Sequence, residues 1–205
     1  MATTRGLLLV RADPDLAAAW AASGLVAVYV AALGDGWTAI MPSDARAVTA
    51  APYDDPVAVL LGRQVPRRLT GAIGVAQVGP RVVLSVVPHV LRPRRGWLVW
   101  EPGQGMVRVR HLAPATAGQL AATAGRREAG PAVSRLLHEA RGTPVTVLQE
   151  VFGALGLPGH DLAVGDREPS AMPGARLVRP RRQGVEVFDR LAQEDQRWRS
   201  EFERS

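Results

Sequence analysis

The order of the apolar patterns along the chain limits the fold more than any single motif does. Short apolar runs bounded by Gly, Pro and Asp fill the first half, and runs with helical spacing fill the second. The chain opens in a β-α-β-β order, with strands over 6–11, 25–32 and 37–41 and a helix from Pro14 to Ser23. Strands followed by helices predict an α+β protein rather than an alternating α/β one.

Four more apolar runs follow at short intervals and predict a β-meander within residues 71–112. Its strands are expected over 72–78, 81–87, 97–101 and 106–112. We therefore expect one mixed or antiparallel sheet with helices on one face. A separate N-terminal β-α-β-β unit beside the meander is the alternative.

The rest of the chain divides by composition. Residues 115–156 carry helical spacing and complete a predicted globular domain over 1–157. Residues 158–183 are rich in Gly, Pro and Arg and indicate a linker or an exposed wrapping segment. Residues 184–205 predict a C-terminal tail ending in an amphipathic helix.

Missing residue types exclude several kinds of chemistry. The chain contains neither Cys nor Lys, and every basic residue apart from the histidines is Arg. It therefore has no thiolate nucleophile or thiolate zinc ligand, and no Lys for a Schiff base or a P-loop. We predict no cofactor. No run approaches 18 apolar residues and the first ten residues lack a leader-like pattern, so we expect a cytoplasmic protein without a membrane partner.

Candidate catalytic residues are few. The four histidines never occur as a close pair and no Gly-x-Ser-x-Gly motif is present, so we predict no metal site and leave the catalytic residues unassigned. A small-molecule enzyme would have to assemble its site from distant residues, for which His160, Asp161 and Ser85 are the candidates.

Positive charge is concentrated in the middle of the chain, because residues 63–112 carry nine arginines and one acid, Glu101. If the last two meander strands pair across a four-residue turn, Trp97 faces Arg110, Val99 faces Arg108, and Trp100 lies on the opposite, buried face. This register predicts an exposed basic sheet face that could bind an anionic partner. A solvated face on which arginine side chains cover Trp97 is the alternative. The candidate partner-binding residues are Arg92, Arg94, Arg95, Trp97, Arg108 and Arg110.

The C-terminal helix carries a narrow apolar stripe on an otherwise charged surface. Phe188, Leu191, Trp198 and Phe202 follow spacings of 3, 7 and 4, close to a coiled-coil seam that Asp195 interrupts. These four residues are the candidate interface of a homodimer. Packing of the helix on its own domain is the alternative.

These patterns favour a non-enzymatic binding module. We expect it to engage a protein partner, carrying acidic groups, through the basic sheet face and the C-terminal helix. Nucleic-acid binding by the Arg and Trp surface is the second hypothesis, and the small-molecule enzyme is the third.

Overall fold

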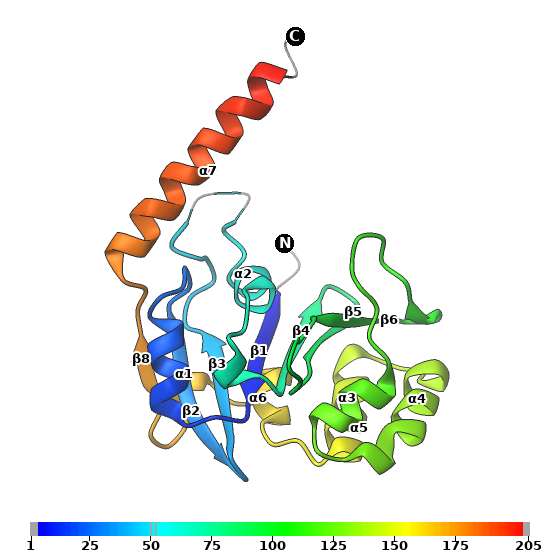
Figure 1. Cartoon of the computed structure of the whole chain (residues 1–205). Helices are drawn as coiled ribbons and strands as arrows, with labels where there is room; N and C mark the ends of the chain where they lie inside the picture. Colours follow the sequence, from blue (N-terminus) through cyan, green and yellow to red (C-terminus); the bar gives the residue numbers. More distant parts are fainter. Residues whose placement is uncertain (1–3, 50, 52, 203–205) are drawn as a thin grey trace.

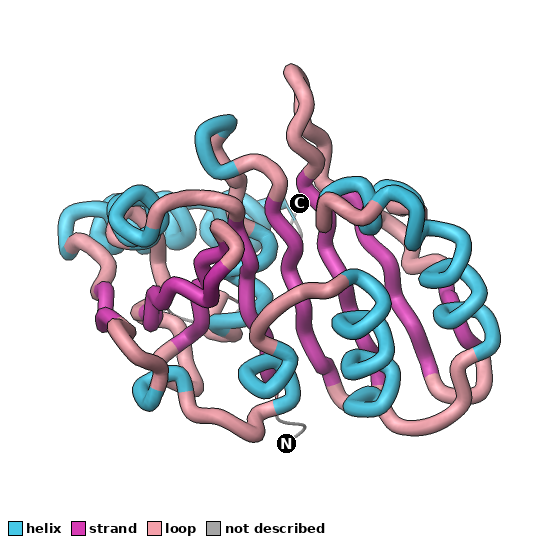
Figure 2. Tube along the Cα trace, turned by 90° about the horizontal axis from the view of Figure 1, so that it is seen from below, coloured by secondary structure: helices cyan, strands magenta, loops and turns pink. Residues whose placement is uncertain are grey.

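The computed structural model describes residues 4–49, 51 and 53–202, without the side chains of 195–197 and 199–202. Within this part of the chain a single eight-stranded sheet has the order β7-β6-β5-β4-β1-β3-β2-β8 (Figure 2). Every neighbouring pair of strands is antiparallel. The strands are β1 Arg5–Val10, β2 Val28–Gly34, β3 Trp37–Pro42, β4 Ala72–Val78, β5 Arg81–Val87, β6 Gly96–Glu101, β7 Gly105–Val107 and β8 Arg176–Val178.

The helices begin and end close to their capping signals. Asp13 caps the helix that opens with Pro14, and Thr116 and Gln119 form a capping box. The α-helices are α1 Pro14–Ala21, α2 Pro56–Gly62, α3 Ala117–Thr123, α4 Gly130–Glu139, α5 Pro144–Leu155, α6 His160–Val164 and α7 Arg182–Phe202. Short 3₁₀ turns are η1 Arg67–Leu69, η2 Arg127–Ala129 and η3 Pro169–Ala171.

Strand β1 joins the two halves of the sheet. Leu8 is paired with Ile40 of β3 on one side and with Gly74 of β4 on the other. The β-α-β-β opening and the meander therefore form one antiparallel sheet, as predicted, and the alternative of two separate units is wrong. The α+β class and the C-terminal helix are confirmed.

Helices cover both faces of the sheet, which corrects the prediction that they cover one. Leu7 and Leu9 of β1 belong to the core beneath α3, α4, α5 and α6. Leu8 and Val10 belong to a second core beneath α1, α2 and η1. Successive side chains of a strand point to opposite faces of the sheet. Because β1 is apolar at successive positions, both faces of the sheet have to be covered.

The segment over 158–183 wraps the domain and is not a free linker. The apolar run Leu162–Val164 lies in α6 and is buried in the core. Strand β8 then extends the sheet at its edge, where Val178 is paired with Val28. The Gly and Pro residues of this segment thus separate short elements that pack on the domain.

The last strands of the meander are shifted by one residue from the predicted register. Trp100 is paired with Met106 and Val99 with Val107, and the loop holds three residues, 102–104. Strand β7 ends at Val107, and residues 113–115 then return to the edge of β6. There the Trp97 N–H donates to the carbonyl of Ala113, and the Ala115 N–H donates to the carbonyl of Trp97. This returning segment occupies the place beside Trp97 that the prediction gave to Arg110.

Helix α7 leaves the domain at its first turns and extends away from the sheet (Figure 1). Among the described residues no helix is both long and apolar enough to cross a membrane.

Candidate interaction surfaces

The base of α7 is attached to the domain by a few contacts. The Val185 side chain is buried, and the Phe188 ring meets the Tyr53 ring edge to face, with centroids 5.2 Å apart. The backbone N–H of Arg181 donates a hydrogen bond to the carbonyl of Ala22. These contacts fix the direction in which the helix leaves the domain.

The apolar stripe of α7 is exposed beyond this base. Leu191 is 58% exposed and Trp198 is 64% exposed. Phe188 is half-buried against its own domain, while the predicted interface position Phe202 has a side chain outside the described residues. Of the predicted seam, Phe188 therefore packs on its own domain, whereas Leu191 and Trp198 are exposed.

Six arginines lie in two adjoining connections between elements, one of which contains η1. We call them the arginine surface: Arg63, Arg67, Arg68, Arg92, Arg94 and Arg95. The Arg95 guanidinium donates a hydrogen bond to the backbone carbonyl of Arg63, and Thr70 Oγ1 lies 2.9 Å from His89 Nδ1. These two contacts hold the loops side by side. No Asp or Glu occurs between residues 63 and 100, and within the described chain none of the six forms an ion pair.

Two exposed aliphatic side chains stand beside these arginines. Val90 is 51% exposed and Leu91 is 71% exposed. The arginine surface thus combines unpaired guanidinium groups with a small apolar patch. It lies in loops beyond the strands, which corrects the prediction of a basic sheet face.

The sequence-predicted binding residues are divided between two places. The Arg95 guanidinium lies 5.8 Å from the centre of the Trp97 ring, and burial lowers the pKa of Arg95. Trp97 is half-buried against the core beneath α1 and α2, so the indole is not an open stacking surface. Arg108 and Arg110 are exposed in the segment after β7 and do not lie beside Trp97 in the sheet.

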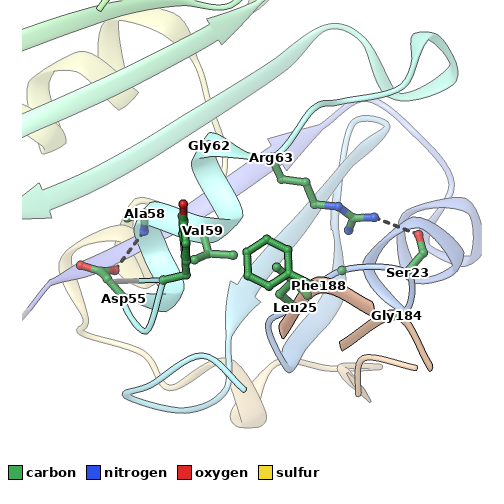
Figure 3. Close-up of a pocket in the computed structure, with 11 residues that line it drawn as sticks. Ser23, Leu25, Asp55, Ala58, Val59, Gly62, Arg63, Gly184 and Phe188 are labelled. Carbon is green, nitrogen blue, oxygen red and sulfur yellow. Dashed lines mark hydrogen bonds between the residues drawn. The ribbon is translucent and has the colours of Figure 1, made fainter. Parts of the chain in front are cut away.

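A pocket of about 590 Å³ opens where α2 meets the base of α7 (Figure 3). Its walls are mostly apolar, and its charged groups are Arg63 and Asp55. It is lined by Ser23, Gly24, Leu25, Tyr53, Asp55, Ala58, Val59, Gly62, Arg63, Gly184 and Phe188. These residues come from three separate segments of the chain, 23–25, 53–63 and 184–188.

Arg63 is held in place by contacts with the end of α1. Its Nη1 donates to the carbonyl of Trp20 and its Nη2 donates to Ser23 Oγ, each at 2.8 Å. The guanidinium also lies 4.2 Å from the centre of the Trp20 ring. Burial lowers the pKa of Arg63 to about 10, so the side chain remains charged at neutral pH.

Gly24 makes room for this guanidinium. A Cβ at position 24 would lie 2.6 Å from Arg63 Nη1, which is too close for ordinary contact. The absence of a side chain there allows the Arg63 guanidinium to lie over the Trp20 ring at the rim of the pocket.

Asp55, which lines the same pocket, is the N-cap of α2. Its Oδ1 accepts hydrogen bonds from the backbone N–H groups of Val57 and Ala58, each at 2.9 Å, and thereby caps α2. No ion pair forms between Asp55 and Arg63.

The residues suggested for an enzyme do not form one site. Ser85 is fully buried, and a Cβ at Gly74 would touch both its hydroxyl and Leu61, which places Ser85 on the α2 face of the sheet. His160 belongs to α6, which packs on the other face. The Asp161 carboxylate forms an ion pair with Arg167 at 2.9 Å. Among the described residues no cluster of three or more His, Asp or Glu side chains suits a metal ion.

Sequence reasoning missed the pocket and the role of Arg63. The Asp55-Pro56 pair is a local signal for the start of α2, but the contact between α2 and α7 depends on how the chain packs. No known protein family, curated protein or solved structure matches this chain.

Proposed function

We propose that this protein is a non-enzymatic interaction module that engages a protein partner through α7, and that the partner at α7 is a second copy of the chain. The observation that carries this proposal is the exposed apolar stripe of a helix that extends away from its own domain. Leu191 and Trp198 have no cover within the described part of their own chain.

The length of α7 supports pairing. A helix of 21 residues is about 30 Å long, and the contacts with the domain that its described residues make lie in its first turns. Most helix stability in proteins comes from packing an apolar face and not from helix propensity. Pairing two copies along the stripe would supply that packing.

The charge pattern of α7 favours a parallel pair. With Phe188 and Leu191 at the a and d positions of a heptad, Glu194 occupies a g position and Arg199 the following e position. In a parallel two-stranded coiled coil these positions face each other across the seam and carry opposite charges. Asp195 falls at an a position, where a polar residue lowers stability and restricts register.

The oligomeric state of seam variants tests this proposal. Light scattering of the full chain should give the mass of a dimer, and Leu191→Glu with Trp198→Glu should give a monomer with unchanged thermal unfolding of the domain. Gln193→Glu, on an exposed position away from the seam, is the matched control and should remain dimeric. A monomeric wild-type chain at about 100 μM would reject pairing at the micromolar affinities expected of a specific interface.

The arginine surface supports a second contact. Guanidinium groups without a carboxylate partner in the described chain suit carboxylates of an acidic protein, and the exposed Val90 and Leu91 suit the apolar residues of such a partner. Nucleic-acid binding is the alternative function, favoured by the same unpaired arginines, because phosphates dominate nucleic-acid affinity. Because Trp97 is half-buried against the core, that alternative lacks an open stacking platform.

A further inference from the structure

We propose that the pocket at the base of α7 binds a small organic anion, with a flat apolar body and one carboxylate. The pocket belongs to a single chain, so this inference does not depend on pairing through α7. Its volume of about 590 Å³ lies within the range typical of small-molecule sites.

The walls determine the apolar part of the ligand. Leu25, Ala58 and Val59 form an aliphatic side, while Tyr53 and Phe188 contribute aromatic rings. Figure 3 shows the Phe188 ring reaching into the space between α2 and the end of α1. A planar ring system would cover these side chains and exclude water from them.

The charged groups determine the polar part. Two hydrogen bonds of Arg63 are used by Trp20 and Ser23, which leaves donors of its five-donor guanidinium for a ligand. A guanidinium binds a carboxylate with two parallel hydrogen bonds, and this one is already held in a fixed orientation. Arg63 has no ion-pair partner in the described chain, so an incoming carboxylate would displace no internal carboxylate.

Asp55 orients the ligand. In Figure 3 the Asp55 and Arg63 side chains lie on opposite sides of the Phe188 ring. A carboxylate beside Asp55 would be repelled, whereas the same group beside Arg63 would be attracted. The ligand therefore directs its carboxylate toward Arg63 and its apolar body toward Phe188 and Val59.

Calorimetric titration with 2-naphthoate and its neutral isostere 2-naphthamide tests the proposal. We expect saturable binding of one naphthoate per chain, with affinity about tenfold or more above that of the amide, as a charge-assisted contact gives. Arg63→Gln should weaken naphthoate binding about tenfold or more and leave amide binding nearly unchanged. Arg68→Gln, on the same loop but outside the pocket, is the matched control and should bind naphthoate as the wild type does.

A second variant keeps the test informative if Arg63→Gln fails to fold. Ala58→Phe places a ring in the pocket from an exposed position of α2 and should abolish naphthoate binding without lowering thermal stability. Equal affinity for acid and amide, equal losses in Arg63→Gln and Arg68→Gln, or no saturable binding of naphthoate would each overturn the proposal. If Ala58→Phe changed the oligomeric state while naphthoate did not bind, the pocket would be occupied by a second copy, and the ligand proposal would be wrong.

Discussion

The rings of Tyr53 and Phe188 meet edge to face, with their planes at 86°, and this contact joins α7 to the loop before α2. It closes one side of the pocket and sets the angle at which the rest of α7 leaves the domain. The same two side chains therefore connect the ligand pocket with the helix that is proposed to pair.

Removing this contact should loosen the base of α7. An aromatic pair of this geometry contributes about 0.5–1.5 kcal/mol beyond the area it buries. Tyr53→Ala should therefore accelerate hydrogen exchange of the amides over 185–192 while leaving exchange in the central strands unchanged. Exchange in that stretch as slow as in the wild type would show that the contact does not anchor the helix.

The buried face of β6 should be far more sensitive to truncation than the segment after β7. Trp100 is 1% exposed within the core beneath α3 and α4, whereas Arg110 is exposed. Trp100→Ala should lower the free energy of unfolding by about 3–5 kcal/mol, and Arg110→Ala by less than about 1 kcal/mol. Urea denaturation of both variants gives the comparison, and similar losses in the two would contradict the observed burial.

The contrast between these two residues also shows which features the sequence could predict. The burial of Trp100 follows from strand alternation and does not depend on the partner strand. The neighbour of Trp97 depends on a three-residue loop and on residues 113–115 returning to the sheet edge. A one-residue shift in register changes every cross-strand pair. Because side chains alternate along a strand, it also moves the side chains of the shifted strand to the opposite face.

Other misses have similar causes. The unbroken apolar run Leu7–Val10 could have indicated cover on both faces, and the run Leu162–Val164 could have indicated a packed element inside the supposed linker. The pocket had no local signal, since its walls come from segments more than 100 residues apart. Capping signals are local, by contrast: Asp13, Thr116 and Thr143 stand directly before α1, α3 and α5 and cap them.

The arginine surface predicts salt-dependent binding to polyanions. Arg67→Glu with Arg94→Glu should leave a heparin column at lower salt than the wild type, because both side chains are exposed and unpaired in the described chain. Arg135→Glu with Arg141→Glu changes net charge equally at two exposed positions outside these loops and is the control. Equal elution of the two double variants would show that only net charge matters.

The same variants separate the two partner classes. If the arginine surface binds nucleic acid, a single-stranded oligonucleotide should bind with a salt slope of about −0.7 for each phosphate contacted, and the slope should shrink in Arg67→Glu with Arg94→Glu. An acidic protein partner predicts no measurable oligonucleotide binding at physiological salt.

Binding of naphthoate should depend on pH only in the alkaline range. Burial lowers the pKa of Arg63 to about 10, and a base loses its charge as the pH rises through its pKa. Affinity should therefore be constant from about pH 6 to 9 and fall above about pH 10. A loss of affinity between about pH 6 and 8 would instead indicate a histidine and would contradict the role given to Arg63.

The most direct test of pairing through α7 is a distance between two copies of the helix. The chain has no cysteine, so Gln193→Cys provides one labelling site, at an exposed position away from the seam. Pulsed electron paramagnetic resonance of the nitroxide-labelled protein should give an intermolecular distance of about 20–35 Å, as expected for labels on the outside of two helices each about 10–12 Å wide. In the labelled protein that also carries Leu191→Glu with Trp198→Glu, this distance should disappear, because that variant is expected to be monomeric. The absence of any dipolar coupling in the labelled parent protein at about 100 μM, far above a micromolar dissociation constant, would contradict the account.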